Sequence, residues 1–120
     1  MRDDKKNIID EKSFEFSLRI VKFCKALRNH GHYDLARQVF RSGTSIGANV
    51  REAQNAESRK DFIHKFKIAT KEADEVEYWL LLCKESSEIP SPGELCTDAL
   101  ELMKIMSKII STTKTIESKA

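Results

Sequence analysis

Apolar residues recur every three or four positions along most of this 120-residue chain, in blocks separated by polar or turn-forming segments. Such spacing gathers apolar side chains on one face of an α-helix, and no segment shows the apolar–polar alternation of a half-buried strand. Only 4 glycines and 2 prolines are present, which leaves little material for the turns of an all-β fold. The sequence therefore predicts a single all-α domain. Its periodic blocks lie at about 14–29, 34–56, 60–84 and 92–116.

Short connections between the blocks favour an up-down-up-down antiparallel four-helix bundle. Apolar spacing close to 3.5 residues in the later blocks favours shallow, left-handed helix crossings. The rows expected to meet in the core are Leu35, Val39, Ser42/Gly43, Ile46, Val50 and Ala53; Phe62, Phe66, Ala69, Ala73, Val76, Leu80 and Cys83; and Leu95, Ala99, Leu102, Met106, Ile109, Thr113 and Ile116.

Residues at the block ends supply helix start signals. Ser13 and Asp34 are the expected N-caps of the first two helices, and Ser58 with Asp61 forms an expected capping box before the third. The run Ser91-Pro92-Gly93-Glu94 places serine at the N-cap and proline at the first helical position, so the fourth helix is expected to begin there.

The first block carries two apolar rows rather than one. A helix of this kind is expected to be covered on more than one side, and Gly31 is expected to end it. The rows are Phe14, Leu18 and Val21, and Phe16, Ile20, Phe23 and Leu27.

The second helix must accommodate the stretch FRSGTSIGANVREAQ, residues 40–54. Each glycine inside a helix costs about 1 kcal/mol relative to alanine, so two of them call for compensation. Gly43, Gly47 and Ala48 are predicted to provide it by letting a helix pack closely, either inside the bundle or between subunits. The alternative is a kink or break near Gly43-Thr44.

No pattern of residues predicts catalysis, a cofactor or a metal ion. The sequence lacks a glycine-rich phosphate loop, His-Glu-x-x-His and a nucleophile elbow, and no glutamate stands three residues before any of its histidines, His30, His32 and His64. The three cysteines are expected to be reduced thiols in helix seams. Without a signal-peptide core or a membrane-length apolar run, the protein is expected to be cytoplasmic and free of membrane contacts.

Charge is strongly polarised along the chain. Twelve basic and four acidic residues lie between Arg19 and Lys71, whereas six acidic residues and one basic residue lie between Glu72 and Glu88. A basic corner where the second helix ends and the third begins suits a phosphate backbone. The alternative is a solvated surface neutralised by nearby acids. The candidate nucleic-acid-binding residues are Arg41, Arg51, Arg59, Lys60, Lys65 and Lys67.

Tyr78 and Trp79 add large apolar surface next to Leu80, Leu81 and Leu82. A bundle of this size cannot easily bury all of these side chains internally, so we expect this pair to take part in helix packing or in contacts between subunits. The sequence thus predicts a homo-oligomer.

The segments SFEFSLRIVKFCKAL, RQVFRSGTSIGANVREAQNAES and KDFIHKFKIATKEADEVEYWLLL resemble the 23S rRNA-intervening-sequence protein family of four-helix bundle proteins. The resemblance covers residues 14–84 and departs at Gly47, where many members have proline. It implies a four-helix bundle and a ring-shaped homo-oligomer, commonly a pentamer. A related branch of the family is the accessory protein of diversity-generating retroelements, which is thought to bind nucleic acid and a reverse transcriptase.

Two hypotheses of function follow. The first is a non-enzymatic homo-oligomer that binds RNA or DNA backbones non-specifically through its basic surface. The alternative is a protein-interaction scaffold or accessory subunit for a partner such as a polymerase.

Overall fold

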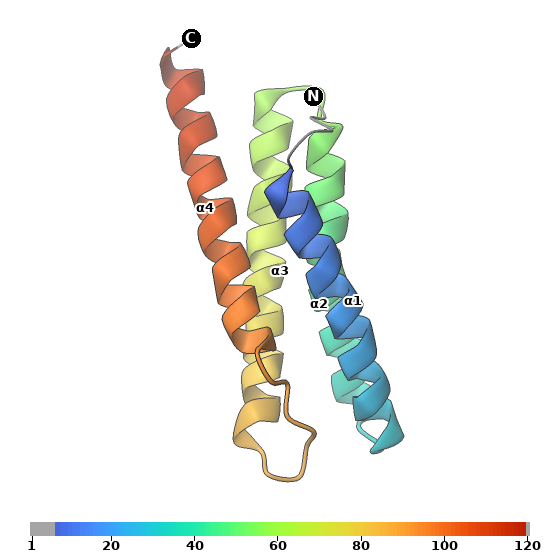
Figure 1. Cartoon of the computed structure of the whole chain (residues 1–120). Helices are drawn as coiled ribbons and strands as arrows, with labels where there is room; N and C mark the ends of the chain where they lie inside the picture. Colours follow the sequence, from blue (N-terminus) through green and yellow to red (C-terminus); the bar gives the residue numbers. More distant parts are fainter. Residues whose placement is uncertain (1–6, 120) are drawn as a thin grey trace.

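The computed structural model describes residues 7–119, which form four α-helices and no strand. The helices are α1 (Ile8–Asn29), α2 (Tyr33–Gln54), α3 (Arg59–Glu85) and α4 (Leu95–Lys119). They run alternately down and up, and each contacts its neighbours in chain order while α4 also meets α1 (Figure 1). The predicted all-α, up-down-up-down bundle is confirmed, and the left-handed crossing stays a prediction.

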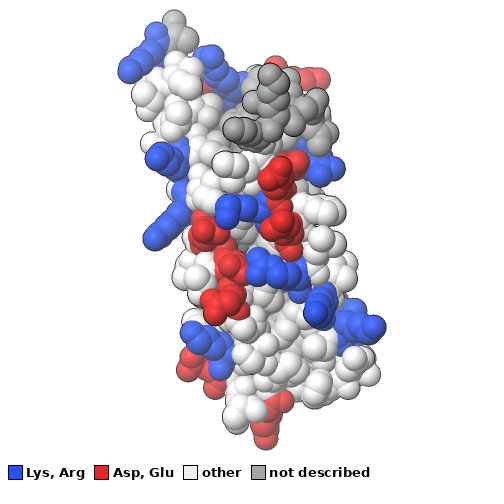
Figure 2. Space-filling model, viewed as in Figure 1, with Lys and Arg blue, Asp and Glu red and all other residues white. Residues whose placement is uncertain are grey.

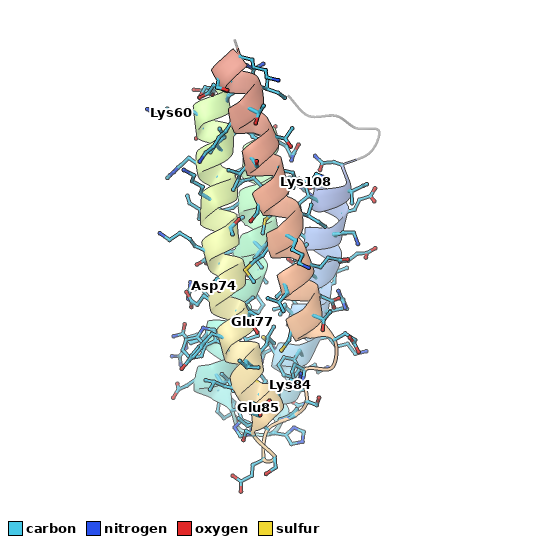
Figure 3. The ribbon with its side chains drawn as sticks, turned by 90° about the vertical axis from the view of Figure 1, so that its left-hand side faces the viewer. Lys60, Asp74, Glu77, Lys84, Glu85 and Lys108 are labelled. Carbon is cyan, nitrogen blue, oxygen red and sulfur yellow. The ribbon has the colours of Figure 1, made fainter. Side chains whose placement is uncertain are left out.

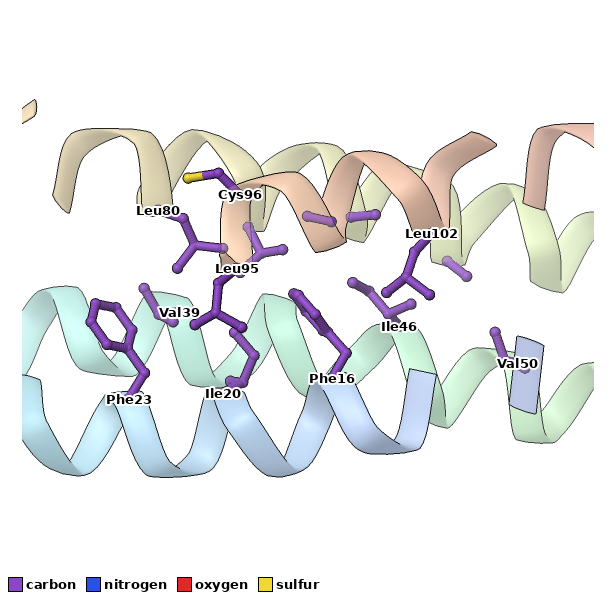
Figure 4. Packing of buried hydrophobic residues seen from close by; sticks show 14 of the residues in the cluster. Phe16, Ile20, Phe23, Val39, Ile46, Val50, Leu80, Leu95, Cys96 and Leu102 are labelled. Carbon is purple, nitrogen blue, oxygen red and sulfur yellow. The ribbon is translucent and has the colours of Figure 1, made fainter. Parts of the chain in front are cut away.

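The core lies along the shared axis of the rod, between inward-facing rows from all four helices (Figure 4). Phe16, Ile20 and Leu27 are buried from α1, so the second of its two predicted rows faces the core. The other row, which begins at Phe14, is exposed in the single subunit. The remaining large and fully enclosed side chains come from α2, α3 and α4: Val39, Ile46, Val50, Phe66, Val76, Leu80, Leu102 and Met106.

The predicted rows of α2, α3 and α4 each need correction at an outer end. In α2, Leu35 is half-buried, whereas its neighbour Ala36 is buried. Ile63 is buried at the start of α3, whereas Phe62 is only half-buried, with its ring 4.8 Å from that of Phe66. Near the end of α4, Thr113 is half-buried and Ile116 is exposed. The end of α4 is exposed because it extends past the ends of the other helices (Figure 1).

Helix α1 begins six residues before the predicted start. Asn7 is its N-cap and its side chain accepts a hydrogen bond from the Asp10 backbone N–H, at 3.2 Å. Ser13 is therefore not a cap but a buried residue inside the helix, where its hydroxyl donates to the Asp10 carbonyl. Gly31, with φ of +82°, follows the end of α1 as predicted.

Of the start signals predicted for the other three helices, one is confirmed and two are wrong. Ser58 caps α3 as predicted, since its side chain accepts a hydrogen bond from the Asp61 N–H at 3.0 Å. Asp34 is not a cap, because α2 already begins at Tyr33 after His32, which makes no side-chain cap bond. Helix α4 begins at Leu95 rather than Pro92, because Gly93 adopts a φ of +59° that an α-helix cannot contain.

Helix α2 is continuous through residues 43–47, so the predicted alternative of a break is wrong. Gly43 lies against the Ile20 side chain of α1, and a methyl group added there would come within 2.9 Å of Ile20 carbons. At Gly47 it would come within 3.1 Å of the Ser17 hydroxyl and 3.3 Å of the Ser13 carbonyl. The two glycines therefore let α1 and α2 approach each other closely along this line.

Candidate nucleic-acid interface

The outer surface of α3 carries one uninterrupted basic row. Lys60, His64, Lys67 and Lys71 follow one another at spacings of four, three and four residues, so they project from the same side of the helix, and all four are exposed. None makes an ion pair or side-chain hydrogen bond within residues 7–119. With a rise of about 1.5 Å per residue, the row is about 16 Å long.

Three of the predicted binding residues are instead occupied by acidic partners. The Arg41 guanidinium pairs with Glu72, at 3.3 Å, and with Glu75. Arg51 Nε lies 3.4 Å from a carboxylate oxygen of Asp10 on α1. These contacts join α2 to its two neighbours and give both arginines acidic partners at the surface.

Lys65 belongs to the same group. Its ammonium donates to the Glu52 carboxylate at 2.9 Å, and this hydrogen bond raises the pKa of Lys65. By contrast, Arg59, Lys60 and Lys67 make no ion pair within the described part of the chain. The structure thus brings only these three predicted residues onto a surface of unpaired positive charge.

The charge of α3 reverses half-way along the helix. Figure 3 shows Lys60 near its start and Asp74, Glu77 and Glu85 along its second half, with Lys108 of α4 on the same half of the molecule as Lys60. Elsewhere the charges are mixed. On the α1–α4 side, Arg19 pairs with Asp98 and Lys12 with Glu101, so that basic and acidic side chains interleave over this face (Figure 2).

Tyr78 and Trp79, the two aromatic residues predicted to pack between helices or subunits, differ in solvent exposure. Tyr78 is 55% exposed, whereas Trp79 is half-buried and its Nε1 donates to Glu75 at 3.0 Å. Their rings meet edge to face with centroids 5.2 Å apart. Trp79 therefore supports the α2–α3 ion-pair cluster, while Tyr78 faces outward.

Of the small residues predicted for helix packing, Gly43 lies inside the α1–α2 contact, whereas Gly47 and Ala48 lie at its outer edge. Ala48 is exposed and does not contribute to helix packing in the subunit. Together with Phe14, Ser17 and Gly47 it borders a shallow groove of about 280 Å³.

Cys24, Cys83 and Cys96 are free and buried, as predicted. Burial raises the pKa of Cys24 and of Cys83 to about 11, and it also raises that of Cys96, so all three are neutral thiols at physiological pH. Within residues 7–119 no group of three histidine, cysteine or acidic side chains is placed to hold a metal ion. No helix in this range is both long and apolar enough to cross a membrane.

The family model of the 23S rRNA-intervening sequence protein matches residues 5–115. The chain belongs to this family. It is also similar to a crystal structure from Bacteroides thetaiotaomicron, described as a protein with unknown function from the S23 ribosomal protein family. The two share 44% sequence identity over 86% of this chain and 98% of that chain, with a TM-score of 0.82. No curated protein matches the chain.

For this member of the 23S rRNA-intervening sequence protein family, sequence reasoning missed two residues of the basic row, His64 and Lys71. The signal that could have found them was their spacing from Lys60 and Lys67, which follows a single helical face.

Proposed function

We propose that this protein binds the phosphate backbone of RNA or DNA without catalysis, through the basic row of α3, which consists of Lys60, His64, Lys67 and Lys71. The observation that carries the proposal is the absence of acidic partners along the row. Each strand of a duplex presents a phosphate about every 3.4 Å along the axis, so a row about 16 Å long spans several phosphates.

The unpaired state of the row matters for the binding free energy. A lysine that already pairs with a carboxylate must lose that partner before it can neutralise a phosphate, and this exchange reduces the net gain. Lys65 would have to release Glu52 in this way, whereas Lys67 is exposed and unpaired. Binding is therefore assigned to Lys60, Lys67 and Lys71, with Arg59 as a neighbouring contributor.

A homo-oligomer would strengthen this weak site. The net charge of the chain is only +2, which is low for a protein that binds nucleic acid tightly as a single subunit. Repetition of the row in several copies would convert separate contacts into a multivalent surface.

Fluorescence anisotropy with a labelled RNA hairpin and a labelled DNA duplex, in about 50 mM and about 200 mM salt, tests the proposal. If one subunit makes three phosphate contacts, this rise in salt should weaken duplex binding roughly 40-fold, because each contact adds about 0.9 to the slope of log affinity against log salt concentration. Similar affinity for unrelated sequences is expected, because the contacts are to phosphates.

The variant Lys67→Glu should weaken binding clearly at low salt. Lys22→Glu provides the matched control, because Lys22 is an exposed and unpaired lysine on α1, away from the row. Equal effects of the two variants would show that only net charge matters. No binding at low salt, together with a partner protein that stays bound after nuclease treatment, would favour the accessory-scaffold function instead.

A further inference from the structure

A pocket with aromatic and basic walls lies at the end of the bundle where α1 joins α2. Its volume is about 340 Å³, and it is lined by Arg28 of α1 and by Tyr33, Ala36, Arg37 and Phe40 of α2. This end lies opposite the one where α2 joins α3 (Figure 1). No residue of α3 lines the pocket, so it is separate from the basic row of that helix.

Two aromatic rings project from one face of α2 at this pocket. Tyr33 is 64% exposed and Phe40 is 43% exposed, and the seven residues between them correspond to about 10 Å along the helix axis. Ala36 lies between them, is buried, and contributes only a methyl group to the floor. Aromatic rings stack at centroid separations of about 4.5–7 Å, so one planar ring between the two lies within stacking distance of both.

The charged side chains of the pocket are two arginines. Arg28 is exposed and makes no ion pair within residues 7–119. Arg37 pairs with Asp34 at 3.2 Å, but the side chain of Asp34 is 95% exposed. An ion pair so open to solvent is weak, so Arg37 can exchange this carboxylate for a phosphate at little cost. Guanidinium groups bind phosphates through two parallel hydrogen bonds, which makes both arginines suitable phosphate ligands.

The combination of rings and guanidinium groups matches a nucleotide. A nucleobase has flat faces that stack on aromatic side chains, while its phosphate binds arginine. An apolar ligand would leave the two arginines unused, and an inorganic phosphate would leave the two rings unused. A base inside a duplex is already stacked between its neighbours, so the base that enters this pocket must be unpaired.

We propose that this pocket binds one unpaired nucleotide, with its base between Tyr33 and Phe40 and its phosphate on Arg28 and Arg37. The same chemistry recognises a nucleotide within a single strand and one that is free in solution. The inference goes beyond the proposed function and does not rest on it, because it assigns a second site that contacts the base rather than the backbone alone. Little preference among the bases is expected, since each of them has a face that can stack.

The test compares two labelled single strands by fluorescence anisotropy. One is an oligothymidylate, and the other is a strand of equal length that consists only of abasic nucleotides. Both carry the same phosphates, so the ratio of their affinities measures contact with the bases alone. The wild-type protein should bind the oligothymidylate roughly fivefold or more tightly, which is the gain typical of one stacked base. Equal affinity for the two strands would overturn the proposal.

Variants of the two rings locate the contact. Tyr33→Ala and Phe40→Ala should each remove most of the preference for the oligothymidylate and leave the affinity for the abasic strand unchanged. Tyr33→Trp should keep the preference, because any aromatic ring can stack. Tyr78→Ala, at an exposed tyrosine of α3, is the matched control and should keep it as well. Circular dichroism should show intact helices in every variant. An unchanged preference in both alanine variants of the pocket would contradict the assignment.

Arg28→Ala should weaken binding of both strands and make the single-strand salt slope shallower by about 0.7, the contribution of one phosphate contact. Unchanged affinity would overturn the assignment of the phosphate to this arginine. Alanine substitutions in the basic row of α3 should weaken both strands by the same factor and leave the ratio of affinities unaltered. The two proposals can therefore fail separately.

Adenosine monophosphate, added as a competitor, distinguishes the two sources of the nucleotide. Displacement of the oligothymidylate at micromolar concentration would assign the pocket to a free nucleotide. Displacement only at millimolar concentration would assign it to a nucleotide within a strand, where neighbouring phosphates add affinity.

Discussion

At the scale of single residues, Gly43 shows why a residue that weakens an isolated helix is present in this one. Its position against Ile20 leaves no room for a side chain, so the cost in helix propensity is offset by close packing of α1 on α2. The sequence indicated the need for close packing, but it could not say which helix would be the neighbour, because that depends on the three-dimensional register of the two rows.

Gly43→Leu should lower the free energy of unfolding by about 1–3 kcal/mol, the usual cost of inserting carbons into a packed core. Chemical denaturation followed by circular dichroism measures this change. Ser111→Leu, at an exposed position of α4, serves as the control and should have little effect. An unchanged stability for Gly43→Leu would show that the seam is loosely packed.

The buried thiols predict a dependence of stability on alkaline pH. In the unfolded chain the thiols ionise near the ordinary pKa of 9.0, while burial keeps the folded Cys24 and Cys83 protonated up to about 11. Between these values the folded state holds more protons, so stability should fall as pH rises, by roughly 1.4 kcal/mol per pH unit for each thiol. Below about pH 9 both states are protonated and this contribution does not vary.

Other groups also ionise in this range, so the comparison is with Cys24→Ala, which removes one of the two thiols. Its unfolding free energy, measured by denaturation at several pH values, should decline less steeply than that of the wild-type protein. Parallel curves for the two proteins would exclude Cys24 as a source of the pH dependence.

At the scale of the helices, ion pairs between α2 and α3 decide which basic residues are free. Arg41 with its two glutamates and Lys65 with Glu52 lie along this seam. The sequence located the basic block correctly, yet pairs between residues about thirteen to thirty-four positions apart cannot be read from spacing within one helix. The free row of α3 could have been found from its own period.

Arg41→Ala should destabilise the protein by about 1 kcal/mol, because the lost ion pairs are partly exposed. It should leave nucleic-acid affinity nearly unchanged. Arg37→Ala is the matched control on the same helix and should change stability less, since within residues 7–119 Arg37 pairs only with the exposed Asp34. Denaturation and anisotropy on the same preparations separate the two effects. A large loss of nucleic-acid affinity in Arg41→Ala would show that Arg41 contacts the nucleic acid.

Helix boundaries were the least predictable feature at this scale. Ser13 and Ser91 both have favourable cap chemistry, but Asn7 extends α1 past the first serine and the left-handed Gly93 delays α4 past the second. Where a segment contains two possible N-cap residues, the helix begins at the earlier one if the extra turn can bury an apolar side chain. In α1 the added turn buries Ile9, which joins the core.

At the scale of the whole molecule, apolar periodicity was enough to predict the fold, but it did not show which helix faces would stay exposed. Four rows at helical spacing were enough to predict the bundle, because antiparallel helices with short connections have few other ways to bury them. Which faces stay exposed depends on the arrangement of the helices, and the exposed row of Phe14, Leu18 and Val21 illustrates this. Its apolar character was visible in the sequence, but its position outside the subunit was not.

The most direct test of the central claim is the slope of the logarithm of duplex affinity against the logarithm of salt concentration. It should be measured for the wild-type protein and for the chain carrying Lys60→Ala, Lys67→Ala and Lys71→Ala. The slope of the variant should be shallower by about 2.7 for each subunit that engages the duplex, about 0.9 for each lost phosphate contact. Equal slopes for the two proteins would contradict it, because the row on α3 would then make no contact with the backbone.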